Sequence, residues 1–174
     1  MKITFKVLYF SLIFFLSNLL YAETNVAYIN LDKIYNESNA GKFILDEIEK
    51  INKKNISNFK KNEEILKKEE KEISSQQNIL SKEEYEKKVL SFKAKVDKYR
   101  SDRNKTINNL KNKRIKALNE LSKTVNKILA QYSVEKNLSF VLPKKNIVIG
   151  KSELEITNEI LTIVDKEIKK VKIN

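Results

Sequence analysis

The sequence predicts a mostly helical α+β protein in which a long antiparallel helical hairpin projects from a small base containing β-strands. Three observations lead to this expectation. Residues 43–134 contain neither glycine nor proline, and their apolar residues recur at alternating spacings of three and four, as on one face of a helix. A cluster of polar, weak helix formers interrupts this stretch near residues 74–81. The flanking segments, 23–42 and 135–174, contain short apolar runs typical of strands.

The first 22 residues are expected to be a secretory signal peptide. Lys2 and Lys6 precede an almost wholly apolar run over 7–20, and Ala22 supplies a small residue before the expected cleavage site. A retained membrane anchor is the alternative, but a run of about 14 residues is shorter than the ~20 needed to span a bilayer. The chain has no cysteine, which excludes a lipoprotein anchor and any disulfide framework.

The part before the hairpin is predicted to be a strand and a connector. Residues 26–31 form an apolar run suited to a strand, and the connector over 32–42 has room for one helical turn and closes at Gly41. Hairpin helices are then expected over 43–79 and from Lys82 to about Val134, with Ser81 and Glu84 forming a capping box. The alternative is one unbroken helix of about 90 residues.

The part after the hairpin is predicted to hold two strands and a helix. Asn137 suits a left-handed position after the second long helix. Strands over 138–142 and 147–149 are expected to pair through a turn at 143–146, and a capping box at 152–155 opens a final helix. Three short strands and one helix make a marginal core, so several copies are expected to pool their strands. The residues expected to do so are Val26, Tyr28, Ile29, Leu138, Phe140, Val141, Ile147 and Ile149.

The helical hairpin carries the candidate binding residues, in an apolar set and a basic set. The apolar side chains would zip the two helices together, and their flanks would also face a bound molecule; they are Phe59, Leu66, Ile73, Tyr85, Val89, Phe92, Val96 and Tyr99. The basic side chains fit acidic protein or anionic lipid, and they are Lys87, Lys88, Lys93, Arg100, Arg103, Lys111, Lys113 and Arg114. Residues 60–116 carry 18 basic and 10 acidic side chains, although a general lysine bias would account for much of this excess.

The composition argues against an enzyme. The chain has no histidine and no cysteine, so nucleophile–base pairs and the usual transition-metal ligands are missing. Its two glycines form no phosphate-binding loop. We therefore expect no metal, no cofactor and no ATP site, and export makes nucleic acid an unexpected partner.

Two stretches resemble the Skp/OmpH-like periplasmic chaperones. Residues 26–42, VAYINLDKIYNESNAGK, are similar to the opening strand and AGK-like ending of that family, and residues 155–161, EITNEIL, resemble its last helix start. Glu155, Asn137 and Pro143 depart from the family pattern at caps and turns.

The resemblance implies a jellyfish-like homotrimer in the periplasm, with a small intersubunit β-barrel body and three hairpin arms. Such proteins hold unfolded outer-membrane proteins without ATP and prevent their aggregation. The expected division is therefore a signal peptide (1–22), a trimerisation body (23–42 and 135–174) and an arm (43–134). The alternative function is a structural envelope protein whose basic hairpin binds anionic lipid or lipopolysaccharide.

Overall fold

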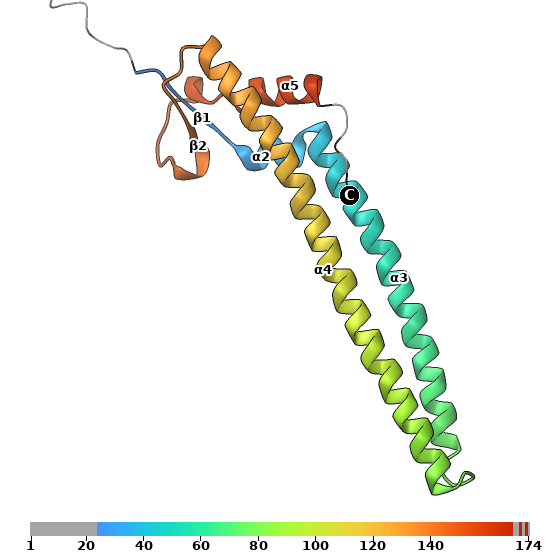
Figure 1. Cartoon of the computed structure of the whole chain (residues 1–174). Helices are drawn as coiled ribbons and strands as arrows, with labels where there is room; N and C mark the ends of the chain where they lie inside the picture. Colours follow the sequence, from blue (N-terminus) through green and yellow to red (C-terminus); the bar gives the residue numbers. More distant parts are fainter. Residues whose placement is uncertain (1–23, 169–170, 172, 174) are drawn as a thin grey trace, which may run out of the picture.

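The computed structural model describes residues 24–168, 171 and 173, and it shows a long two-helix arm standing on a small mixed base (Figure 1). The predicted signal peptide and its cleavage site lie outside these residues. The chain order is one strand, a short helix, the two long helices, a second strand, two single 3₁₀ turns and a last helix. The predicted α+β class, dominated by helix, is confirmed.

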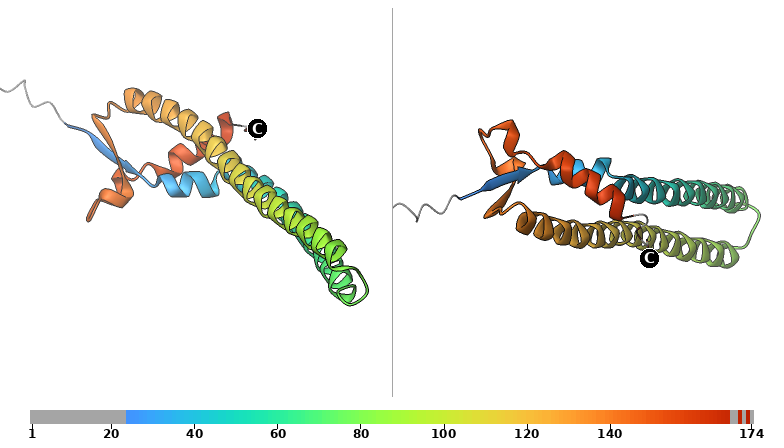
Figure 2. Two further views of the ribbon diagram at one scale, coloured as in Figure 1. Left: turned by 60° about the horizontal axis from the view of Figure 1, so that its bottom comes forward. Right: turned by 90° about the horizontal axis from the view of Figure 1, so that it is seen from above.

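The arm is an antiparallel hairpin of α3 (Asn39–Ser75) and α4 (Lys82–Glu135), which contact each other and are seen side by side in Figure 1 and in the right view of Figure 2. At 1.5 Å per residue these helices are roughly 55 and 80 Å long. The Ser81 side chain accepts from the Glu84 backbone N–H, and the Glu84 carboxylate accepts from the Ser81 N–H, so the predicted capping box is present. The turn excludes the single unbroken helix.

The connector predicted before the arm is wrong, because almost all of it is helix. α2 (Leu31–Glu37) is followed at once by α3, and the buried Ser38 is the N-cap that separates them. Gly41 therefore lies in the first turn of α3 instead of closing a loop. Its role is close approach, since an added Cβ would overlap the Tyr35 carbonyl group.

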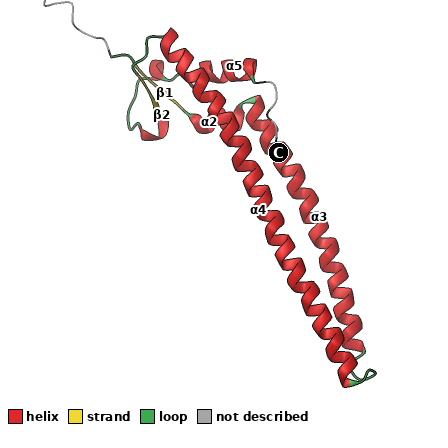
Figure 3. Ribbon diagram, in the orientation of Figure 1, coloured by secondary structure: helices red, strands yellow, loops and turns green. Residues whose placement is uncertain are grey.

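The sheet is smaller than predicted, and it is parallel. β1 (Val26–Ile29) pairs with β2 (Phe140–Pro143), in a register that matches Val26 with Phe140 and Ile29 with Pro143 (Figure 3). The predicted strand at 147–149 and its hairpin turn are wrong. Lys144–Asn146 is instead a 3₁₀ turn closed by the Ile147 N–H on the Lys144 carbonyl, and because this turn replaces the hairpin turn, residues 147–149 do not pair with β2.

The last helix begins later than predicted. α5 spans Thr157–Glu167, after a 3₁₀ turn at Ser152–Leu154 and a single bridge between Tyr28 and Glu155. The second capping box does not form, because the Glu155 carboxylate is held by Lys144 and Thr157 and cannot reach back to Ser152. Asn137, at φ 52°, does adopt the left-handed conformation expected after α4.

The hydrophobic core lies where the roots of α3 and α4 meet α2, β1 and α5. Ile34, Ile44, Val125, Ile160 and Val164 are all completely buried there. The core therefore draws on the first turns of α3 and on the last turns of α4, as well as on the segments outside the arm. Beyond it towards the tip, no residue of the arm is fully buried.

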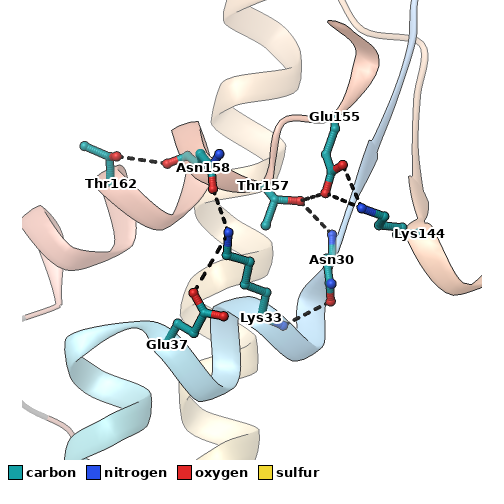
Figure 4. Close-up of polar contacts among 8 residues, drawn as sticks. All are labelled: Asn30, Lys33, Glu37, Lys144, Glu155, Thr157, Asn158 and Thr162. Carbon is teal, nitrogen blue, oxygen red and sulfur yellow. Dashed lines mark hydrogen bonds and ion pairs between the residues drawn. The ribbon is translucent and has the colours of Figure 1, made fainter. Parts of the chain in front are cut away.

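A chain of hydrogen bonds ties β1 to the start of α5 at the edge of this core (Figure 4). The Asn30 N–H donates to the hydroxyl of the buried Thr157 (2.9 Å), and Thr157 donates to Glu155 (3.0 Å). Lys144 completes the chain with a 2.8 Å contact to the Glu155 carboxylate, which lowers the pKa of that carboxyl below its usual value. Lys33 joins α2 to α5 through the Asn158 side chain (3.0 Å).

Candidate functional site

Polar contacts across the two helices fix the register of the arm. The Tyr99 hydroxyl donates to the Glu63 carboxylate (2.6 Å), and Lys95 pairs with Glu69 (2.6 Å). Nearer the tip, Lys88 donates to the Gln76 side chain (2.5 Å). All three contacts lie at the rim of the apolar seam. They therefore set which residues of α3 and α4 face one another.

Arg103 sits at the point where the seam turns polar. Its guanidinium lies 3.4 Å from the Glu63 carboxylate and 5.3 Å from the centroid of the Phe59 ring, a distance suited to a cation–π contact. Burial, followed by the hydrogen bond to Glu63, raises the pKa of Tyr99, so this hydroxyl stays a donor throughout the physiological range. Glu63 thus contacts two residues of α4 at once, accepting a hydrogen bond from Tyr99 and forming an ion pair with Arg103.

The predicted apolar seam is brought together along the arm. All eight of its residues are half-buried, and on α4 the stretch 82–100 is otherwise exposed. The zipper role of these side chains is therefore visible in the structure, because a fully solvated face would leave them exposed. Each also keeps part of its surface in solvent, along the two edges of the seam.

The predicted site residues leave out a second group of apolar residues, which lie beside the seam and are more exposed than the seam residues. Ile79 at the tip is 78% exposed, Leu90 64% and Ile65 62%. The signal that could have found them is an isolated large apolar residue on an otherwise charged helical face, outside the three-and-four spacing. The whole group is Ile56, Ile65, Ile79, Leu90, Ile107 and Ile115.

Two grooves flank the seam in the half of the arm nearer the tip, one on each side. The larger, here called groove A, has a volume of about 820 Å³ and is lined by Glu63, Leu66, Lys67, Glu70, Phe92, Lys93, Val96, Asp97, Tyr99, Arg100 and Arg103. The smaller, groove B, has a volume of about 350 Å³ and is lined by Asn62, Ile65, Leu66, Glu69, Lys95, Lys98, Tyr99 and Asp102. Leu66 and Tyr99 contribute to both because they lie in the seam between them.

The predicted basic residues do not form one patch. Lys93, Arg100 and Arg103 meet in groove A, and the others are spread along α4. Lys113 is half-buried and the remaining seven are exposed. Lys87 pairs with Glu83 one turn away (2.9 Å), so part of this charge is already neutralised within the helix.

The predicted oligomerisation residues divide between the core and the surface. Tyr28 and Ile29 are buried within the chain's own fold, at 7% and 2% exposure. Phe140 is 60% exposed and Ile149 92% exposed, and Val148, absent from the prediction, is 97% exposed. Val26, Leu138, Val141 and Ile147 are half-buried. Exposed apolar surface on the base is therefore concentrated on β2 and on the segment after it.

Within residues 24–168, no three acidic, histidine or cysteine side chains gather in a way that could hold a metal ion. Among the helices that the structure describes, none is long and apolar enough to cross a membrane.

The architecture is a long helical hairpin rooted in a small α+β base. Comparison with known proteins shows which family has this architecture. The family of outer membrane proteins described as OmpH-like matches residues 25–164, so the chain belongs to the OmpH-like family. A crystal structure of a candidate outer membrane chaperone (OmpH-like) from Caulobacter crescentus CB15 superposes with a TM-score of 0.79 over 87% of this chain and 89% of that chain. At 16% identity this likeness shows a shared fold. No curated protein matches the sequence significantly.

Proposed function

We propose that this protein is an ATP-independent chaperone of the periplasm that holds unfolded outer-membrane proteins and keeps them from aggregating before membrane insertion. The observation that carries the proposal is an arm with a half-buried apolar seam, charged rims and no packed core of its own, in a chain that belongs to the OmpH-like family. In this role the protein is a binding protein and not an enzyme.

The arm suits the holding of an unfolded chain because its contacts are many and individually weak. Half-buried seam residues and isolated exposed residues such as Leu90 offer small apolar areas, each contributing on the order of 1 kcal/mol at about 25 cal/mol per Å². The basic excess of the arm attracts acidic chains over a Debye length of ~8–10 Å. A client held in this way leaves when its own folding gains exceed the sum of these contacts.

The test of this function is light scattering by an unfolded β-barrel membrane protein diluted out of urea. The mature protein should suppress aggregation at a few-fold molar excess without nucleotide, and failure to suppress it would contradict the proposal. The capture rate should also fall as salt is raised. A rate that does not change with salt would mean that the basic side chains reflect composition only.

We also propose that the working form is a homotrimer whose base is a β-barrel shared between subunits. Its support is the open outer edge of β2 together with the exposed Phe140, Val148 and Ile149. Sedimentation should give three times the subunit mass, and Val148→Asp should shift the species towards monomer. A monomeric native mass for the unmodified protein would refute this assembly.

The alternative function, a structural envelope protein whose arm binds anionic lipid or lipopolysaccharide, rests on the predicted basic residues of α4, of which seven are exposed. The two functions differ in where the protein resides. A free chaperone should stay in the soluble periplasmic fraction and bind unfolded protein. An envelope component should sediment with membranes and be released by high salt.

A further inference from the structure

Grooves A and B lie at the same height on the arm, but they differ in how their charges are engaged. In groove B both cations already hold a carboxylate, because Lys95 lies 2.6 Å from Glu69 and Lys98 lies 2.7 Å from Asp102. An incoming charged group would have to displace one of these partners. Groove B therefore has no unpaired cation with which to bind an added negative charge.

Groove A leaves cations free. Arg103 is held by Glu63 (3.4 Å) and Arg100 lies 3.9 Å from Asp97. Lys67 and Lys93 form no ion pair with any residue that the structure describes, and Glu70 is the one carboxylate of the lining in the same condition. Two free ammonium groups against one free carboxylate leave groove A able to accept an added negative charge.

The floor of groove A is apolar and has a regular spacing. Phe92 and Val96 are half-buried neighbours on one face of α4, about 6 Å apart along the helix axis. An extended polypeptide turns every second side chain to the same face, at intervals of about 6.8 Å. The volume of about 820 Å³ lies within the range of about 300–1,000 Å³ seen for ligand-binding pockets. An extended segment thus fits the floor along its length.

We propose that groove A, and not groove B, is where an unfolded client docks on each arm. The occupant is an extended segment in which apolar side chains lie on Phe92 and Val96 while a neighbouring carboxylate reaches Lys67 and Lys93. The proposal rests on the chaperone function proposed above, and it assigns that function to one face of the arm and to a sequence preference for apolar residues next to acidic ones.

Site-specific photocrosslinking tests the face directly. Because the chain contains no cysteine, Glu70→Cys places a single thiol in groove A and keeps Lys67 and Lys93, while Asn62→Cys places one in groove B and keeps both of its ion pairs. With a benzophenone maleimide on each, the crosslink yield to an unfolded β-barrel client should be on the order of fivefold or more higher from residue 70. Equal yields overturn the proposal. A groove A probe that crosslinks to phosphatidylglycerol vesicles and not to the client also overturns it, in favour of a lipid site.

Charge reversal tests the two lysines. Lys67→Glu/Lys93→Glu should weaken client binding by on the order of tenfold, as expected when two attractive contacts become repulsive. Lys61→Glu/Lys105→Glu makes the same change of net charge with exposed residues that line neither groove, and it should weaken binding less than about threefold. Equal weakening by both pairs means that only overall charge matters and overturns the proposal.

The outcomes separate this inference from the function beneath it. If the unmodified protein does not suppress client aggregation, the chaperone function itself fails. If it does suppress aggregation while the two probes crosslink equally, only the assignment to groove A fails. Helical content and native mass are measured for every variant. If a charge-reversed variant does not fold, the crosslinking result alone tests the assignment to groove A.

Discussion

The two glycines of the chain should differ in how strongly the same substitution destabilises the protein, because their surroundings differ. At Gly41 an added Cβ would overlap the Tyr35 carbonyl oxygen and lie 2.7 Å from its carbon. Both atoms are backbone at the end of α2, so the helices would have to separate by more than about 1 Å to restore an ordinary contact of 3.4–4 Å. That separation would also strain the 3.0 Å hydrogen bond from the Gly41 N–H to the buried Ser38 hydroxyl.

The expected cost of Gly41→Ala follows from these two effects. Overpacking against backbone costs about 3 kcal/mol, the upper end of its usual range, and a weakened N-cap adds about 1 kcal/mol. A total of about 3–4 kcal/mol corresponds to a fall in melting temperature of about 6–16 °C for a chain of this size. The melt is followed by circular dichroism at 222 nm, at one fixed protein concentration because assembly would make the midpoint depend on it.

Gly150→Ala is the matched control. The nearest atoms to a Cβ there are side-chain carbons, Tyr28 Cε1 at 3.1 Å and Ile147 Cγ2 at 3.3 Å. These can give by a few tenths of an ångström, so the melting temperature should change by less than about 3 °C. A Gly41→Ala protein that melts within about 2 °C of the unmodified one would refute the close approach of α2 and α3.

Other substitutions test the core, the cap and the base network. Leu121 is 1% exposed, so Leu121→Ala should lower the free energy of unfolding in urea by about 3–5 kcal/mol. Val96 is half-buried on the seam, so Val96→Ala should lower it by less than half as much. Equal losses would contradict the placement of the core. Ser81→Ala should cost about 1 kcal/mol locally and speed amide hydrogen exchange in the first turn of α4 only, and faster exchange throughout α4 would contradict a local role. Glu155→Gln should destabilise by about 1 kcal/mol at neutral pH. Because folding lowers the pKa of Glu155, the stability that its carboxylate contributes is present above its usual pKa of 4.5 and is lost as the pH falls through the folded value. The unmodified protein and Glu155→Gln should therefore converge in stability at low pH. A difference in stability that persists there would refute the assignment.

The arm could be predicted from the sequence because its determinants are local. The start of α4 at Lys82 follows from the capping residues, and the seam follows from spacing alone; the end of α3 at Ser75 falls among the weak helix formers, four residues before the predicted end at 79. The base was harder to predict, because its pairings join residues more than a hundred positions apart. Nothing local indicates that β2 pairs parallel with β1, or that a 3₁₀ turn at Lys144–Asn146 replaces the hairpin turn expected before 147–149.

The misreading of Gly41 has a similar origin. Glycine near the start of a helix usually indicates a turn, and only the packing of α3 against α2 shows that this one permits a close contact. For the candidate site, spacing indicated which side chains form the seam. It could not indicate that Lys95 and Lys98 would be paired while Lys67 and Lys93 stay free, because rotamers and partners across the hairpin decide that.

The antiparallel register of the arm has a consequence for how its reach can change in evolution. Because α3 and α4 face each other from root to tip, removing seven residues from one helix requires removing seven from the other to keep Glu63, Glu69 and Gln76 opposite their partners. Such a paired deletion shortens the arm by about 10 Å and leaves the root, the core and the sheet untouched. Arm length is therefore a nearly independent variable, which can change without redesign of the base.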